Sequence, residues 1–132
     1  MVTIQPMQAL AVVIGGGLGS LLRLWVSSWT FRFFGAIGIP WGTLSVNVIG
    51  GLLIGILSAW FIHKESSLAL QSLLVTGFLG GFTTFSTFSL EVVTLFRRQE
   101  HMLALAYSLA SVILCVLAAA VGFLLMRMLV RI

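Results

Sequence analysis

The chain has 132 residues, of which 60% are apolar and only 8% are charged. A soluble domain of this size carries about 25% charged residues, so this sequence lacks the polar surface that a water-soluble globule requires. The formal charge of +4 rests on seven Lys and Arg residues spread along the chain without a basic run, which argues against a nucleic-acid-binding surface.

Four long apolar blocks account for nearly all of the sequence. A helix needs about 20 predominantly apolar residues to cross a bilayer. The predicted spans are about 7–29, 41–62, 68–96 and 102–126. We therefore expect an all-α membrane protein, with residues 1–132 forming one four-helix transmembrane domain in the lipid bilayer. The N-terminus lacks the charged start of a secretory signal, so we interpret the first block as a retained span.

The first block combines glycines at helix-packing spacing with one charged residue. Gly15 and Gly19 are four residues apart, a spacing that lets two helix backbones approach closely in lipid. The same spacing recurs at Gly51 and Gly55 and at Gly77 and Gly81. Arg23 is an ionisable residue inside a span and is therefore a candidate functional residue. Two interpretations are open for it: snorkelling to the interface, or attraction of anions at a pore mouth.

The second block contains a single amide, Asn47, several residues after its start. A lone amide in lipid is costly unless it has a hydrogen-bond partner. Two interpretations are open for this residue. Asn47 either forms an interhelical hydrogen bond that holds the bundle together, or it is a donor that faces an ion path.

The third block contains the sequence Gly-Phe-Leu-Gly-Gly-Phe-Thr-Thr-Phe-Ser-Thr-Phe-Ser over residues 77–89. Adjacent glycines followed by β-branched and hydroxyl residues form a poor continuous helix. Broken backbone inside a membrane survives where it is buried in protein or lines a cavity, and carbonyls freed in this way bind cations in transporters. We therefore predict a third helix broken near its middle; the alternative is a packing helix whose hydroxyls bond to the preceding turn. Glu91 follows, near the end of the span.

The fourth block carries a stripe of weakly polar side chains. Tyr107, Ser111 and Cys115 recur every four residues and share one helix face, with Ser108 at its border. Such a stripe indicates either a hydrated track or helix packing. Cys115 is the single cysteine, so it forms no internal disulfide, and no Cys/His cluster suggests zinc.

Positive charges are balanced between the two ends of the predicted bundle. One end carries Lys64, Arg127 and Arg131, and the other carries Arg32, Arg97 and Arg98. Orientation in the membrane normally follows an asymmetry of Lys and Arg, and none is present. Either both orientations occur and two copies pair antiparallel, or one side wins through features that the sequence does not show.

Over essentially the whole chain, the sequence resembles the Fluc (CrcB) family of fluoride channels. The resemblance is carried by the motif at 77–89 with Glu91, by residues 15–19 with Arg23, and by residues 42–47. The resemblance implies a fluoride-selective channel, not an enzyme, that exports cytoplasmic fluoride passively down its electrochemical gradient. It also implies an antiparallel, dual-topology homodimer with two pores in the bacterial cytoplasmic (inner) membrane.

The resemblance further implies roles for individual residues. The backbone carbonyls of Gly80 and Thr83 would bind a structural sodium ion at the dimer centre. Cys115 stands where some relatives carry a hydroxyl, which is a stronger donor than a thiol. The implied fluoride pathway consists of Asn47, Phe85, Phe88, Thr87, Ser89, Tyr107, Ser111 and Cys115.

The residues suit this chemistry better than they suit the alternatives. Fluoride is strongly hydrated, so a pore must replace the water donors that it removes; amide and hydroxyl groups can do so, and aromatic rings offer a positive edge. The main alternative is a small multidrug-resistance-type exporter that exchanges protons for cations. Such exporters use a glutamate in the first helix, where this chain has Arg23 and no acid. A non-transporting assembly subunit is a third possibility.

Overall fold

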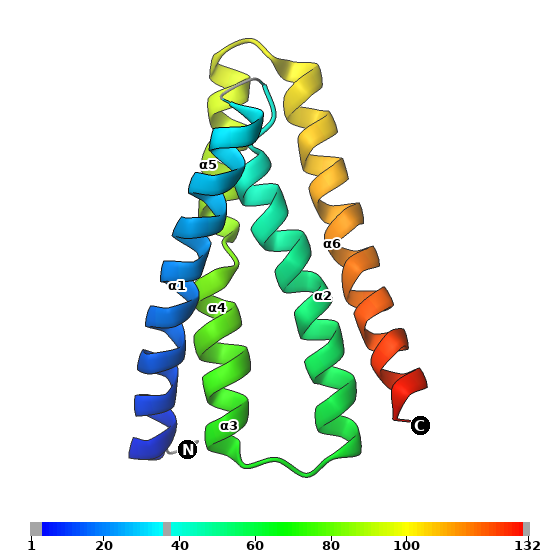
Figure 1. The fold of residues 1–132 in the computed structure, drawn as a ribbon. Coiled ribbons are helices and arrows are strands. Elements are labelled where there is room, and N and C mark those ends of the chain that lie inside the picture. Colours follow the sequence, from blue (N-terminus) through cyan, green and yellow to red (C-terminus); the bar gives the residue numbers. More distant parts are fainter. Residues whose placement is uncertain (1–3, 36–37, 131–132) are drawn as a thin grey trace.

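The computed structural model describes residues 4–35 and 38–130 and is built from helices alone within these ranges (Figure 1). Two short helices and a π-helical segment, η1, precede the break in the third span, and α5 follows it. We refer to residues 68–97 as the third span. The elements are α1 (Pro6–Phe34), α2 (Trp41–His63), α3 (Leu68–Gln71), η1 (Ser72–Leu79), α4 (Gly80–Phe82), α5 (Phe85–Arg97) and α6 (His101–Leu129).

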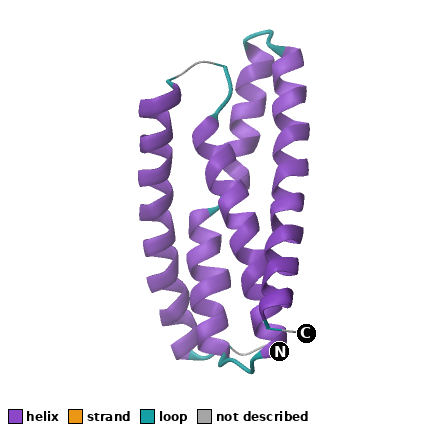
Figure 2. Cartoon of the chain, turned by 45° about the vertical axis from the view of Figure 1, so that its right-hand side comes forward, coloured by secondary structure: helices purple, strands orange, loops and turns teal. Residues whose placement is uncertain are grey.

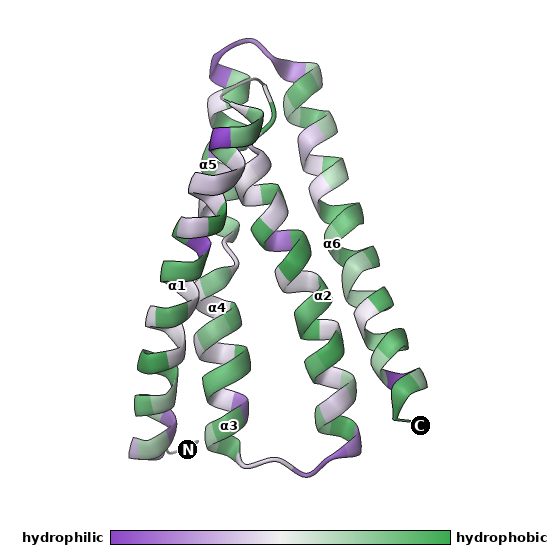
Figure 3. Ribbon diagram, in the orientation of Figure 1, coloured by the Kyte–Doolittle hydropathy of each residue, from purple (hydrophilic) through white to green (hydrophobic). Residues whose placement is uncertain are grey.

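Four helical segments are long and apolar enough to cross a membrane: α1, α2, the third span and α6. Short loops join them in an up-and-down order (Figure 2), and polar residues concentrate at the two ends of the bundle (Figure 3). Both described ends of the chain lie at the same end of the bundle, beside the loop that follows α2 (Figure 1). Arg131, one of the residues in the charge balance, lies outside the described residues.

The bundle consists of two helix pairs, α1 with the third span and α2 with α6. The predicted close approaches at glycines are confirmed in both pairs. A Cβ atom at Gly15 or Gly19 would collide with carbonyl oxygens of η1, and one at Gly55 would collide with the carbonyl of Ala119. Because glycine has no Cβ, the two backbones of each pair can touch, as in other membrane helix pairs.

The third span is interrupted where the sequence predicts a break. Thr83 has ψ 159° and Thr84 has φ −151° and ψ 116°, so both residues are extended between two helical segments. The Thr84 side chain then accepts a hydrogen bond from the amide of Thr87 and acts as the N-cap of α5. A threonine at this position favours the new helix start because its oxygen satisfies an otherwise unpaired amide.

The first helix is longer than the sequence predicts. The predicted span ends at about residue 29, whereas α1 continues to Phe34 and ends at Gly35, which has φ 65°. An apolar block marks only the part of a helix that lies in the hydrocarbon layer. The helix itself can continue beyond that layer into the membrane interface. It ends here at Gly35 because glycine adopts the left-handed region without a steric cost.

The described residues include one buried apolar cluster that joins α2, α5 and α6. It contains Leu44, Leu95, Ala104 and Tyr107. Most other large apolar side chains are exposed on the outside of the bundle, as expected for helices that face lipid. The cluster packs α6 against α5 in the half of the bundle that follows the break.

Candidate functional site

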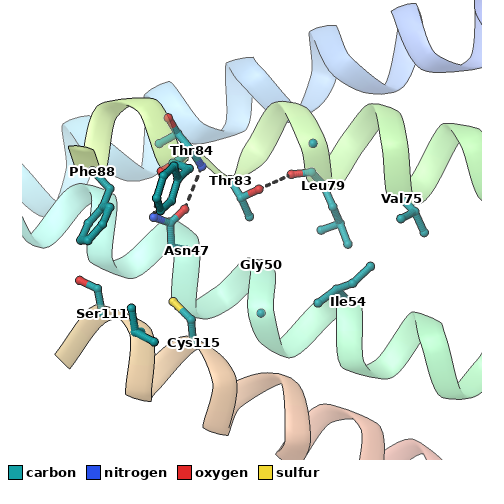
Figure 4. Close-up of a pocket in the computed structure, with 14 residues that line it drawn as sticks. Asn47, Gly50, Ile54, Val75, Leu79, Thr83, Thr84, Phe88, Ser111 and Cys115 are labelled. Atoms are coloured by element: carbon teal, nitrogen blue, oxygen red, sulfur yellow. Dashed lines mark hydrogen bonds between the residues drawn. The ribbon is translucent and has the colours of Figure 1, made fainter. Parts of the chain in front are cut away.

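A cavity of about 460 Å³ lies beside the break, between α2, the third span and α6 (Figure 4). We call it the break cavity. Its wall brings together, from three different spans, seven residues that the resemblance assigned to the fluoride pathway or the sodium site. These residues are Asn47, Gly80, Thr83, Phe85, Phe88, Ser111 and Cys115.

The break releases two backbone carbonyls. In a continuous helix, the carbonyls of Gly80 and Thr83 would accept from amides four residues later. The amide of Thr84 donates instead to Oδ1 of Asn47, at 2.8 Å. The amide of Thr87 donates to Oγ1 of Thr84, at 3.2 Å. Both carbonyls are thereby freed from the helical ladder, on residues that line the break cavity.

Asn47 holds the break to α2 through two hydrogen bonds. Besides accepting from the Thr84 amide, it donates from Nδ2 to the Thr84 carbonyl at 3.1 Å. The interhelical hydrogen bond considered from the sequence is therefore present. An amide group has two N–H donors, so one N–H of Asn47 remains beyond this bond. Its side chain lines the break cavity (Figure 4), and the second interpretation, a donor facing a path, is compatible with the first.

Ser111 brings a hydroxyl donor to the same cavity. Its side chain is only 5% exposed, and its Oγ has no hydrogen-bond partner among the described residues. A buried hydroxyl without a partner costs about 1–3 kcal/mol. Cys115 follows one turn later on α6 and lines the same wall (Figure 4). The cavity therefore holds donor capacity that the protein itself does not use.

Two phenylalanines complete the wall. The rings of Phe85 and Phe88 lie 5.5 Å apart, and the Phe88 ring is 5.4 Å from that of Tyr107. Phe85 is 78% exposed, although it also lines the cavity. The two rings share one face of α5, as expected for residues three apart on a helix.

A second polar group lies one helical turn from the break cavity; it includes Tyr107, whose role in a fluoride path stays a prediction, but the sequence did not predict its contacts. Oγ1 of Thr43 donates to Oε1 of Glu91 at 2.6 Å, and the hydroxyl of Tyr107 donates to Oε2 at 2.7 Å. We call these three residues the Glu91 cluster. Tyr107 is only 2% exposed, and each hydroxyl carries a single proton. Both donors are therefore committed to the carboxylate.

The Glu91 cluster borders a second cavity, of about 470 Å³, toward the end of the bundle that carries Arg98. Thr43 and Glu91 line it, as does Thr87. The sequence offered one signal for this arrangement, because Thr43 precedes Asn47 by four residues and so shares its helix face. The contact itself joins residues 48 positions apart, which no local pattern predicts.

Two other residues of the implied pathway, Thr87 and Ser89, form side-chain hydrogen bonds to partners within the third span. The Oγ1 of Thr87 accepts from Oγ1 of Thr84 at 2.9 Å. Ser89 donates to the carbonyl of Phe85 in its own helix, at 2.9 Å, and it is not among the residues that line either cavity. The roles of Thr87 and Ser89 in a fluoride path stay predictions.

Arg23 lies against the break. Its Nη1 is 3.4 Å from the carbonyl oxygen of Thr83, and the side chain is half-buried. The structure therefore gives this residue a specific backbone partner deep in the bundle, which neither interpretation from the sequence included. Attraction of anions by Arg23 stays a prediction.

Comparison with known proteins places this geometry in a family. The sequence model described as "CrcB-like protein, Camphor Resistance (CrcB)" matches residues 10–123. The chain belongs to the CrcB-like family. It is 48% identical over 121 residues to a protein of Rhizobium leguminosarum bv. trifolii, covering 91% of this chain and 96% of the relative. It is 42% identical over 118 residues to a protein of Hahella chejuensis, covering 89% and 92%. Both relatives are named "Fluoride-specific ion channel FluC".

The resemblance noted in the sequence is thereby confirmed. As a CrcB-like protein with four helices able to cross a membrane, the chain is a multi-pass membrane protein. Its family consists of ion channels and not of enzymes. The match includes most of each of the four spans and both polar groups described above, so the break cavity and the Glu91 cluster belong to the family domain itself.

Proposed function

We propose that this chain is a fluoride-selective channel that exports cytoplasmic fluoride passively across the bacterial inner membrane. The observation that supports this most is the break cavity, where one N–H of Asn47 and the hydroxyl of Ser111 remain available beside two phenylalanine rings. The names of the relatives point the same way. The described residues contain no cluster of three His, Cys, Asp or Glu side chains, and the cavity wall carries no titratable base.

The cavity wall suits a small anion that has lost its water. Neutral donors replace part of the hydration shell without binding so tightly that the ion stays. The positive edges of Phe85 and Phe88 add weak attraction without a proton that fluoride could remove. A larger anion gains less from each donor at its surface because its charge is more spread out. Fluoride also loses more hydration energy than chloride, so its selection over chloride is proposed from the names of the relatives.

The carbonyls of Gly80 and Thr83 fit a structural sodium ion. Hard cations prefer oxygen ligands, and these two oxygens have been released from the helical ladder at one point. Two protein oxygens are too few for a complete shell, so the proposed ion would take the matching pair from a second copy of the chain. When bound, it supplies positive charge beside the anion path.

The proposed assembly is an antiparallel homodimer in which each half contributes to two pores. Two features support it: the balance of Lys and Arg at the two ends, and the 78% exposure of Phe85 on the wall of the break cavity. A phenylalanine that lines an ion path needs cover from lipid, and a second copy provides it. Three lysines added at one end should lock the orientation and abolish efflux when the variant is expressed alone. Full activity of that variant would contradict dual topology.

Efflux from liposomes that contain only the purified chain tests the function. Liposomes loaded with equal potassium fluoride and potassium chloride are diluted into an impermeant salt, a potassium ionophore is added so that K⁺ leaves with the anion, and both anions are followed with selective electrodes. The expected result is rapid fluoride loss with chloride retained as in protein-free liposomes. Comparable release of both anions, or retention of both by folded protein, would refute the proposal.

A further inference from the structure

Arg23 points from α1 toward the third span, although it lies among lipid-facing residues. Its neighbours Leu22, Leu24 and Trp25 are 37%, 61% and 74% exposed, whereas Arg23 is half-buried. It lies 11 residues before the end of α1, which corresponds to about 16 Å along the axis. A charged side chain at such depth requires a partner.

The partner is the carbonyl end of a helix. The helical run before the break ends at Phe82, and the last carbonyls of a helix carry a partial negative charge because they lack amide partners. Arg23 Nη1 lies 3.4 Å from the Thr83 carbonyl. One turn earlier on α1, the hydroxyl of Ser20 lies 3.5 Å from the Gly81 carbonyl. Two donors of α1 therefore meet carbonyls of the segment where this helical run ends.

We propose that Arg23 is a positioning residue that caps the carbonyl end of the first half of the third span and so keeps the break open. In this role its positive charge stabilises the backbone carbonyls at the break instead of attracting anions to the mouth of a pore. The inference rests on the contact between α1 and the break, and it holds whichever ion the protein conducts.

The consequence of losing the cap follows from the hydrogen bonds at the break. The Thr83 carbonyl oxygen has two lone pairs, so it can accept from Arg23 and also contribute to the proposed sodium site. Without Arg23, this carbonyl would lose its hydrogen-bond donor. The nearest substitute is the Thr87 amide, which would return it to helical geometry. That change would take the Thr87 amide from Thr84 Oγ1 and move the Thr84 amide from Asn47. Arg23 thus helps to position Asn47 in the break cavity, because it holds the Thr83 carbonyl and the adjacent Thr84 amide donates to Asn47.

Hydrogen–deuterium exchange of the purified protein in nanodiscs reads the break directly, without any assay of transport. Arg23→Gln should lower the exchange rate of the amides at 84–88 by about tenfold, because these amides would then be bonded within a continuous helix, and faster exchange there would contradict the proposal. The control is Arg32→Gln, a change of another arginine of α1 that lies near its end, and exchange at 84–88 should match the wild type. Unchanged exchange at 84–88 in folded Arg23→Gln would overturn the proposal.

Arg23→Lys keeps the charge and serves if the glutamine variant does not fold. A lysine offers a point charge and no planar fork, so exchange at 84–88 should fall by about threefold. Wild-type exchange in this variant would also overturn the proposal. Fluoride efflux adds a second readout, because attraction of anions is screened by salt and a buried cap is not. The efflux deficit of Arg23→Lys should be the same in low and high concentrations of an impermeant salt, and a deficit that disappears in high salt would favour attraction instead.

Discussion

The break cavity and the Glu91 cluster use the same kinds of side chain and differ in whether their donors are occupied. They lie one helical turn apart, since Thr43 and Tyr107 precede Asn47 and Ser111 by four residues each. In the Glu91 cluster both hydroxyls donate to one carboxylate, at 2.6 and 2.7 Å. In the break cavity Ser111 has no partner among the described residues.

The difference separates polar groups that hold helices together from polar groups that can bind a ligand. A hydroxyl that already donates to Glu91 offers an anion only its lone pairs, which repel it. A hydroxyl without an acceptor carries a desolvation cost that a passing anion can relieve. Residues of one polar stripe can therefore differ in function. Tyr107 and Ser111 share a face of α6, but the Tyr107 hydroxyl already donates to Glu91 and the Ser111 hydroxyl has no partner among the described residues.

The largest effect is expected where a negative charge enters the break cavity. Asn47→Asp keeps an acceptor for the Thr84 amide but loses the donor to the Thr84 carbonyl, and it places a carboxylate beside the anion path. Fluoride efflux from liposomes should fall by at least about 100-fold, which corresponds to roughly 2.7 kcal/mol in the barrier. Size-exclusion chromatography checks that the variant is folded. Wild-type efflux from folded Asn47→Asp would mean that the path runs elsewhere.

The two rings of the break cavity come next. Phe85→Ile and Phe88→Ile keep apolar bulk but lose the positive ring edge, so each should reduce fluoride efflux by about 30-fold. The matched control is Phe96→Ile, at a ring that lies outside both cavities and is 46% exposed. Equal efflux from all three variants would show that the rings serve only as apolar surface.

The Glu91 cluster should respond in stability more than in transport. Glu91→Gln retains one acceptor oxygen, so either Thr43 or Tyr107 loses its partner and the free energy of unfolding falls by about 1–3 kcal/mol. Efflux per folded protein should change by less than about threefold. A thermal melt in detergent and the liposome assay give the two numbers. A loss of efflux as large as that of Asn47→Asp, with normal stability, would place Glu91 in the path.

Local sequence patterns predicted the spans and the break, because each depends on residues close in the chain. Apolar blocks match the bilayer thickness, and two adjacent glycines before Thr83 and Thr84 weaken a helix wherever they occur. The partners of Glu91 and Arg23 could not be predicted in this way. Both contacts join different spans, 48 and 60 residues apart, and they depend on how each helix is rotated about its axis.

One matched pair of serines tests the division between occupied and free donors most directly. Ser108 and Ser111 both lie on α6, but the Oγ of Ser108 donates to the Ala104 carbonyl at 2.7 Å, whereas that of Ser111 is buried without a partner. In side-by-side fluoride efflux, Ser111→Ala should be about tenfold slower than the wild type, and Ser108→Ala should stay within about twofold of it. Equal rates for the two variants, or a larger loss for Ser108→Ala, would contradict the account.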